Sequence, residues 1–255
     1  MTCKTCDNSL RSDFSYCPNC GAKIIRNRLT LKNIWQDLSF QVFNLDNTLF
    51  KTFINLFSKP ELVIESYISG VRKKYMNPIS YFAIAITLSG LLFYIMRNMY
   101  DINLTQSSFS DSKTPNMDFI FDYQGLISYL IVPIYALMTR LLFIDSKKLN
   151  YTEHLVANAY TTAQVSFVQV FICLPLFGFF EIRYDIFNWF FLLAAIIYQF
   201  YVFKRIFQIG LGGTILRGLG YIFMLLFVFI AIGIAIGLIG ILTGNIDIEQ
   251  FKPQG

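Results

Sequence analysis

The most evident deficit in this sequence is charge. Of the 255 residues only 15% are Asp, Glu, Lys or Arg, whereas 55% are hydrophobic. A soluble domain usually carries about a quarter charged residues. The mean hydropathy is +0.51, and the apolar residues gather in long blocks nearly free of charge. This pattern excludes an ordinary soluble globular domain and favours an integral membrane protein.

Catalytic motifs are also lacking. The chain has one histidine, His154, so a metal active site built on several histidines is excluded, and neither an H-E-x-x-H motif nor a nucleophile elbow is present. Gly210, Gly212 and Gly213 are expected to lie in a turn before Arg217, and they lack the Lys-Ser/Thr that completes a phosphate loop. We therefore expect no enzymatic activity.

A signal peptide is not evident either. The first thirty residues are polar and contain cysteines, without the apolar segment that a secretory signal needs. We therefore expect the amino-terminal region to stay in the cytosol. Thiols are kept reduced there, so paired cysteines are more often metal ligands than disulfides.

Four cysteines at the front of the chain form two pairs. Cys3-x-x-Cys6 is followed, after ten residues, by Cys17-x-x-Cys20. Two such turns supply the four sulfurs of a closed, structural zinc site, and Gly21 permits a positive-φ exit from the second turn. Residues 1–26 are thus predicted to be a zinc ribbon with one Zn²⁺. Iron, a redox pair or an unmetallated tail are the alternatives.

The remaining chain is predicted to be all-α, with a membrane domain over residues 78–246 and a tail over 247–255. Each apolar block is close to the twenty residues that cross a bilayer. The fifth cysteine, Cys173, lies inside one of them and is expected to be a buried packing residue. The five expected spans cover residues 79–96, 125–144, 155–180, 186–203 and 219–242.

Charge placement predicts the topology. Residues 1–78 contain eleven Lys or Arg against six acids, and the later connections alternate between acidic or neutral and basic. The positive-inside rule then places the amino terminus in the cytosol and the carboxyl terminus outside. The connections near residues 145–154 and 204–217 would share the cytosolic face.

Residues 27–77 are predicted to form amphipathic juxtamembrane helices. Apolar residues recur there at helical spacing; Pro60 is expected to open a short helix that ends near Gly70, and Asn77 to cap the first span. These helices either lie in the membrane interface or pack on the cytosolic ends of the spans. The basic residues expected to contact anionic headgroups are Arg72, Lys73 and Lys74.

The third expected span carries polar side chains, which must face protein or water. One interpretation is that these side chains line a path for a substrate or ion, with a proton-active gate. The other is that they form hydrogen bonds between neighbouring helices, and we favour this second interpretation. The candidate path consists of Glu153, His154, Asn158, Thr162, Ser166 and Gln169. Small residues in the last span and just beyond it could let a second helix approach, within the chain or in a homo-oligomer: Gly233, Gly237, Gly240 and Gly244.

Several short stretches have the pattern of one family: Cys-x-x-Cys followed by Cys17-Pro18-Asn19-Cys20-Gly21, then Asn44-Leu45-Asp46, Lys59-Pro60, Gly70-Val71-Arg72-Lys73-Lys74-Tyr75, Asn77-Pro78 and Tyr151-x-Glu153-His154. With these stretches the chain resembles a family of uncharacterised bacterial inner-membrane proteins. Family members join an amino-terminal zinc ribbon to several membrane helices, which implies the bacterial inner membrane as location and implies no activity. The five-span layout is also similar to the Yip family of membrane-trafficking proteins, in architecture alone.

Two function hypotheses follow. In the first, the protein is a non-enzymatic membrane protein whose zinc ribbon engages a cytosolic protein partner while the basic residues meet anionic lipid headgroups. In the second, it is a small transporter, channel or lipid-handling protein that uses the polar path. A membrane enzyme ranks third. Nucleic acid is not expected as a partner, because the ribbon offers only Phe14, Tyr16 and a few basic residues for it.

Overall fold

The structure is a computed structural model, and it describes residues 2–3, 6–21, 48–71, 74–102, 104, 124–180 and 183–242. The chain divides into two compact units, Met1–Asp46 and Asn47–Gly255. Each unit is described by itself. The predictions for residues 22–47 lie outside the described residues.

The first unit is a small cysteine-bearing module. Thr2 and Ser9 form an isolated antiparallel bridge, which closes the first cysteine turn into a small hairpin. Its core consists of Cys3, Leu10 and Cys17, with Cys6 and Phe14 partly buried against them. In the described part of this unit, so few apolar side chains do not hold a fold by themselves, and a bound metal would add the missing stabilisation.

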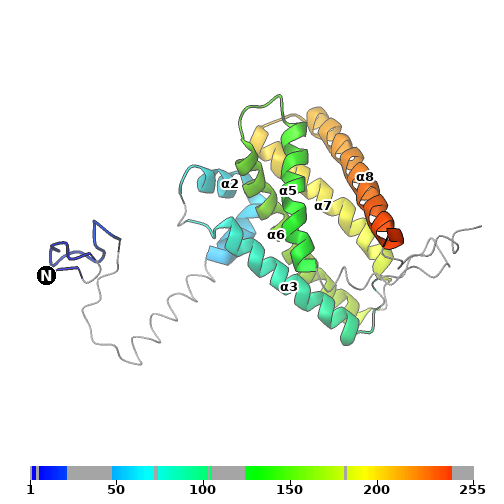
Figure 1. Ribbon diagram of the computed structural model, residues 1–255, viewed down its shortest axis with the longest axis horizontal. Helices are drawn as coiled ribbons and strands as arrows, with labels where there is room; N and C mark the ends of the chain where they lie inside the picture. The colour runs from blue at the N-terminus through cyan, green and yellow to red at the C-terminus, as the bar shows by residue number, and fades with distance from the viewer. Residues whose placement is uncertain are drawn as a thin grey trace, which may run out of the picture. The chain divides into compact units, whose positions relative to one another are not determined.

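The regular secondary structure in the described residues of the second unit is all helical, which confirms the all-α fold. Residues 48–58 form a helix, followed by the elements shown in Figure 1: α2 (Pro60–Ile68), α3 (Pro78–Asn98), α5 (Gln124–Leu142), α6 (Tyr151–Phe179), α7 (Tyr184–Phe207) and α8 (Leu211–Leu242).

Four of these helices are long and apolar enough to cross a membrane: α3, α6, α7 and residues Leu211–Ala231 of α8. A shorter apolar helix, Tyr129–Leu142, is part of α5. Large apolar side chains remain exposed on the outside, such as Phe190 at 71% and Phe223 at 73%. A hydrocarbon environment accommodates such surfaces, and the protein is therefore a helical membrane protein.

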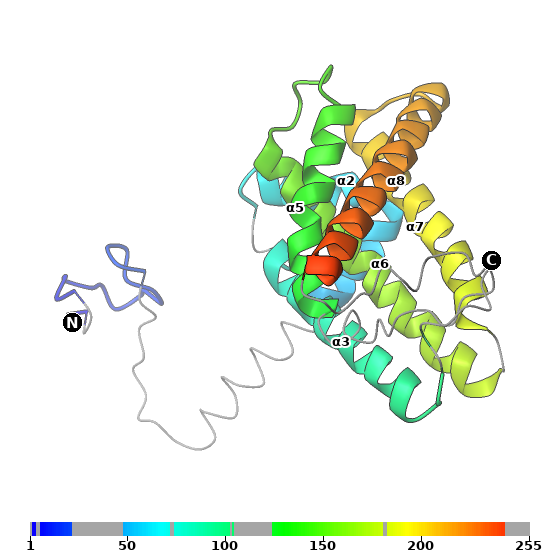
Figure 2. The same cartoon turned by 45° about the vertical axis from the view of Figure 1, so that its right-hand side comes forward.

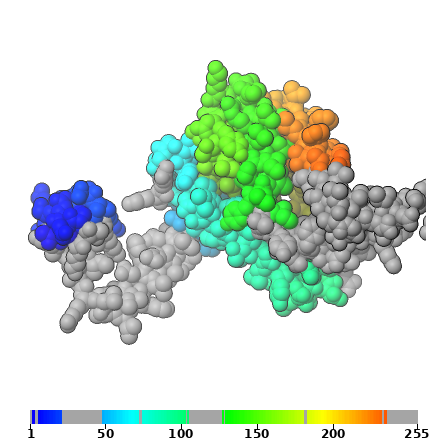
Figure 3. All heavy atoms as spheres, in the orientation of Figure 1, coloured from blue at the N-terminus to red at the C-terminus, as the bar shows by residue number. Residues whose placement is uncertain are grey.

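Helix α6 occupies the centre of the bundle. Helices α3 and α5 pack along it, and α8 packs against α5 and α7. Figures 1 and 2 show α8 on the outside of the bundle beside these two helices, and in the space-filling view α3, α5 and α8 form much of the visible face (Figure 3). Aromatic side chains fill the interior, with Tyr81, Tyr160 and Phe203 fully buried.

The helix 48–58 and α2 pack on α6 and α7. Thr52, Leu56, Val63 and Ile64 are completely buried, and Tyr198 Oη donates a hydrogen bond of 3.0 Å to the Leu56 carbonyl. The opposite face of the first helix is exposed and partly apolar: Phe50, Ile54 and Phe57. The helix 48–58 thus packs on the spans with one face and exposes an apolar face on the other side.

Helix boundaries follow the local sequence at two predicted positions. Helix α2 begins at Pro60, and Gly70 beyond its end has a φ of +92°. Asn77 caps α3, and its side chain accepts a hydrogen bond from Ser80 N at 2.8 Å. The bounds of α2 and the start of α3 therefore agree with the prediction from the sequence.

The last helix begins earlier than predicted. Helix α8 starts at Leu211 instead of residue 219, so Gly212, Gly213 and Arg217 lie inside the helix and not in a turn. Gln208, with a φ of +54°, makes the turn after α7. Glycine in a helix costs about 1 kcal/mol relative to alanine, and the helix still includes Gly212 and Gly213.

Candidate functional site

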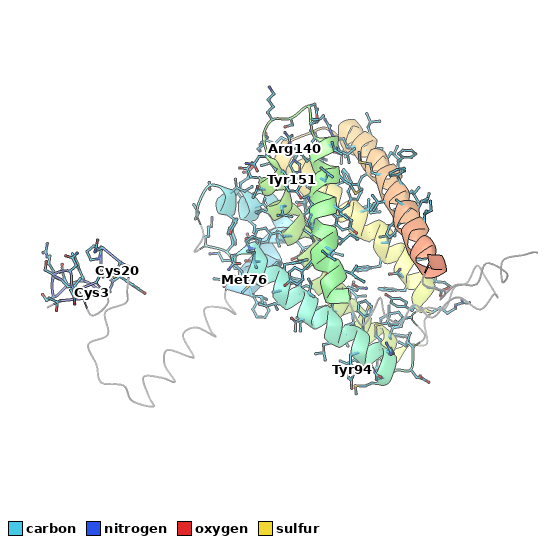
Figure 4. All side chains as sticks on the ribbon, viewed as in Figure 1. Cys3, Cys20, Met76, Tyr94, Arg140 and Tyr151 are labelled. Atoms are coloured by element: carbon cyan, nitrogen blue, oxygen red, sulfur yellow. The ribbon has the colours of Figure 1, made fainter. Side chains whose placement is uncertain are left out.

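Four cysteine sulfurs lie close together in the first unit. The Sγ atoms of Cys3, Cys6, Cys17 and Cys20 are all within 4.8 Å of one another. The shortest separations are 3.6 Å, from Cys3 to Cys20 and from Cys6 to Cys17. Each short separation joins one cysteine turn to the other, and Figure 4 shows Cys3 and Cys20 in the same small module.

The two cysteine turns share a hydrogen bond and a positive φ. Asp7 N donates to the Cys3 carbonyl and Gly21 N to the Cys17 carbonyl, both at 2.9 Å. The residue after the second cysteine has a positive φ in each turn, +57° at Asp7 and +72° at Gly21. Glycine adopts this conformation freely, and aspartate is among the residues that tolerate it. The expectation for Gly21 is therefore confirmed, and Asp7 is its counterpart in the first turn.

This arrangement fits a tetrahedral metal ion. A metal–sulfur bond of about 2.3 Å in a regular tetrahedron separates the sulfurs by about 3.8 Å, which is close to the two short separations. The backbone N–H of Cys20 donates to Cys17 and lowers the pKa of that thiol, which favours the thiolate that a metal requires. The four cysteines can hold one metal ion.

A buried polar cluster lies in the second unit, where α5, α6 and α7 meet. Asn158 Nδ2 donates to Thr139 Oγ1 at 2.9 Å, and Gln199 Nε2 donates to Asn158 Oδ1 at 3.2 Å. His154 Nδ1 lies 3.1 Å from Thr139 Oγ1. These four side chains from three helices are almost completely buried, so they form a specific polar contact inside an apolar bundle.

The hydrogen bonds of Thr139 assign the tautomer of His154. The Thr139 hydroxyl donates to the Tyr135 carbonyl at 2.9 Å, so its oxygen is left to accept, and His154 Nδ1 carries the proton. His154 Nε2 then presents a lone pair. Among the described residues this atom has no hydrogen-bond partner, although the His154 side chain is fully buried.

The His154 ring is held among aromatic rings. It stacks on the rings of Phe203 and Phe207, whose centroids lie 5.7 and 5.8 Å from the His154 centroid. The Phe143 ring centroid lies 6.4 Å from it. Arg140 Nη1 is a second buried atom without a hydrogen-bond partner in the described part of the chain. Figure 4 shows Arg140 and Tyr151 at the same end of the bundle.

The polar residues predicted along α6 separate into several environments. Glu153 does not join His154; its carboxylate accepts from Asn150 N at 2.7 Å and completes the capping box that begins α6. His154 and Asn158 lie in the buried cluster, whereas Thr162, Ser166 and Gln169 are half-buried. The six residues of the candidate path therefore do not form one continuous polar surface along α6.

Other predicted positions are only partly described. Arg72, Lys73 and Gly244 lie outside the described residues, and Lys74 is exposed with its Nζ 5.3 Å from the centre of the Tyr75 ring. Gly233 lies in α8, and a Cβ added to it would meet no described atom within 4 Å. Gly237 and Gly240 also lie in α8.

Sequence reasoning missed Thr139 and Gln199. Both lie on helices other than α6, and their partners are 19 and 41 residues away along the chain. Thr139 and Gln199 are polar residues within largely apolar helices, and this local signal does not identify their partners.

Comparisons with known proteins give one match. Neither the curated proteins nor the solved structures gave a match to this chain. Residues 46–90 match a family model described as "Protein of unknown function (DUF3667)". The match spans the helix 48–58, α2 and the first part of α3, so this segment is similar to an uncharacterised domain family.

Proposed function

We propose that this chain is a non-enzymatic, multi-pass protein of the bacterial inner membrane that uses a cytosolic zinc ribbon to bind a protein partner. The observation that carries the proposal is the four-sulfur cluster, whose Sγ atoms lie within 4.8 Å of one another. Four thiolates with no open position favour a structural role for the ion over a catalytic one. Zinc is the ion that such sites hold most commonly in reducing compartments.

The division of the chain supports an interaction head. The ribbon belongs to a unit of its own, Met1–Asp46, apart from the helical unit. Metal binding supplies folding free energy to a module whose described core is small. A compact module that forms a unit of its own is well suited to present a surface to another protein.

The proposed orientation has the amino terminus in the cytosol and the carboxyl terminus outside. Its support is the alternation of basic and acidic connections under the positive-inside rule. Lys148 and Arg217 belong to the proposed cytosolic end. Lys148 Nζ reaches Glu65 of α2 at 2.8 Å, and Arg217 of α8 pairs with Asp145, so the connection 143–150 contacts α2 and α8 at the proposed cytosolic end.

The test is crosslinking and co-purification from native membranes, comparing wild type with Cys17→Ser/Cys20→Ser at matched expression. Partners lost only from the cysteine variant would support the docking head. Cys173→Ser is the matched control, because Cys173 lies buried in the bundle outside the cluster. An unchanged partner list in the Cys17→Ser/Cys20→Ser variant would contradict the proposal.

The second candidate function is transport, and one observation favours it: the buried, unpartnered Nε2 of His154 among the described residues. Its test is proton flux into liposomes that contain the protein and a pH-sensitive dye. Flux above that of protein-free liposomes, lost in His154→Gln, would favour transport. The hydrogen bonds of Asn158 to Thr139 and Gln199 favour helix contacts instead, so docking remains the first proposal.

A further inference from the structure

An apolar pocket lies between α6 and α7. Its volume is about 160 Å³, and it is lined by Phe57 from the helix 48–58, by Val165 and Val168 from α6, and by Ala194, Ala195 and Tyr198 from α7. Gln164, which also lines it, has its amide engaged: its Oε1 accepts from Tyr81 Oη and its Nε2 donates to the Phe53 carbonyl at 3.1 Å. The pocket therefore offers its occupant an almost wholly apolar wall.

The pocket lies at mid-depth of two membrane spans. Val165 is fourteen residues from either end of α6, and Ala195 is eleven and twelve residues from the ends of α7. Neighbouring side chains on α7 are strongly exposed, with Leu193 at 53% and Ile197 at 62%. In a bilayer the molecules that surround a helix at this depth are acyl chains.

The size of the pocket suits a short stretch of hydrocarbon. An apolar cavity of about 150 Å³ stays dry and holds a molecule the size of benzene. Water is thus a poor occupant, and an empty pocket would deprive its lining of contacts on one side. A terminal part of an acyl chain restores these contacts.

The helix 48–58 forms one wall of the pocket and is firmly attached. Tyr198 Oη donates to the Leu56 carbonyl at 3.0 Å, and Tyr201 Oη donates to the Phe57 carbonyl at 2.9 Å. Phe57 also contacts the Tyr198 ring, with centroids 5.9 Å apart. These contacts hold the helix 48–58, and with it the Phe57 wall of the pocket, against α7.

Basic residues lie near the pocket, at about the distance that separates the bilayer centre from the lipid headgroups. Lys204 is nine residues after Ala195 on α7, about 14 Å along the helix, and half of the hydrocarbon core is about 15 Å thick. Lys59 is exposed two residues after Phe57, whereas Arg205 is paired with Glu61. Lys59 and Lys204 thus supply positive charge where a lipid phosphate would lie.

We infer that the pocket between α6 and α7 binds an acyl chain of an anionic phospholipid, with the headgroup beside Lys59 and Lys204. This site is independent of the cysteine cluster and of any docking by the zinc ribbon. It adds a lipid ligand to the membrane domain.

The test uses the full chain in vesicles that contain a phosphatidylglycerol with a photoactivatable group on its acyl chain. After illumination, mass spectrometry of the peptides locates the adducts. We expect them on residues 165–168 and 194–198. A phosphatidylcholine with the same acyl chain should label these peptides at least about fivefold less, because each basic residue near an anionic lipid contributes about that factor.

Two variants sharpen the experiment. Ala195→Trp fills the pocket and should remove most of the labelling at residues 165–168. Leu193→Trp is the matched control, since it places the same side chain on an exposed position of α7, and it should label like wild type. The wild-type adduct map stands by itself if Ala195→Trp does not fold.

Three results would overturn the inference. One is labelling spread evenly over exposed residues such as Phe223 and Leu226 of α8. Another is equal labelling of the pocket by both lipids, which would refute the anionic phospholipid. The third is crosslinking between two copies of the chain at Val168 or Ala194, which would make the pocket a contact between copies.

Discussion

Asn158 on α6 donates a hydrogen bond to Thr139 on α5 and accepts one from Gln199 on α7, so one side chain joins three helices. Replacing Asn158 by Leu leaves the buried amide of Gln199 without its partner. An unsatisfied buried polar group costs about 1–3 kcal/mol, and polar contacts between membrane helices average about 0.6 kcal/mol. We expect Asn158→Leu to lower the free energy of unfolding by about 1 kcal/mol.

Denaturation of the purified protein in mixed micelles would measure this loss. Thr162→Leu is the matched control, because Thr162 lies one turn further along α6 and makes no side-chain hydrogen bond in the described part of the chain. If both variants unfold like wild type, the polar cluster contributes nothing measurable to stability.

The cysteine cluster should bind one zinc ion per chain. The four sulfurs already lie near the separations that a tetrahedral ion imposes, so elemental analysis of the full-length protein should find about one equivalent of zinc. Cys3→Ser and Cys20→Ser should each lose the metal, whereas Cys173→Ser should retain it because Cys173 lies in a separate apolar cluster. Iron in place of zinc, or metal retained in Cys3→Ser, would contradict the assignment.

The ion pair between Glu61 and Arg205 should make stability depend on pH. Hydrogen bonds from Arg205 Nε, at 3.0 Å, and from its NH2 lower the pKa of Glu61 from its ordinary value of 4.5. A carboxylate with a lowered folded-state pKa stabilises the fold above the unfolded pKa, and this contribution is lost as the pH falls through the folded value.

Glu61→Gln should therefore be slightly less stable than wild type at pH 7, and the difference should shrink steadily below pH 4.5. Thermal unfolding in detergent over a series of pH values measures this. In an Arg205→Leu background, Glu61→Gln should have little further effect. A constant difference between wild type and Glu61→Gln at every pH would rule out the ion pair as its cause.

Local signals explain which parts of the fold are predictable. Asn77-Pro78 contains both the capping side chain and the rigid first residue of α3, and Pro60 marks the start of α2. The start of α8 is not predictable in this way because Gly212 and Gly213 resemble a turn, while the contacts that position the first part of α8 involve residues far away in the sequence. One of these contacts is the hydrogen bond of 3.1 Å from Arg217 Nε to the Leu142 carbonyl at the end of α5.

In the candidate sites, too, local sequence patterns predict some features, and packing between helices decides the others. The cysteine turns are predictable because two residues between cysteines restrict where both sulfurs can point. The sequence suggests Glu153 as a partner of its neighbour His154, yet in a helix adjacent residues face in different directions. The position of Glu153 three residues after Asn150 is the local signature of a capping box. Thr139 and Gln199 join the cluster only through the packing of three helices.

Gly220 should be sensitive to side-chain size where α8 approaches α5. A Cβ at Gly220 would lie 3.0 Å from Leu142 Cδ2, whereas one at Gly233 would meet no described atom within 4 Å. Gly220→Val should therefore lower the unfolding temperature, because the two helices must separate or Leu142 must move. Gly233→Val adds the same side chain to the same helix and should leave the unfolding temperature of the monomer unchanged. Equal effects of the two variants would show that close approach at Gly220 is not the cause.

The connections 143–150 and 208–210 should lie on the same side of the membrane. Arg217 pairs with Asp145, and Lys148 Nζ donates to the Ile206 carbonyl at 2.5 Å, so these connections meet at one end of the bundle. The positive-inside rule places that end in the cytosol. A phosphatase reporter that is active only outside the cytosol should therefore be inactive when fused after Lys147 and active when fused after residue 110, within the acidic connection. The fusion after Lys147 tests the orientation most directly, since its activity would place the basic end outside and invert the proposed topology.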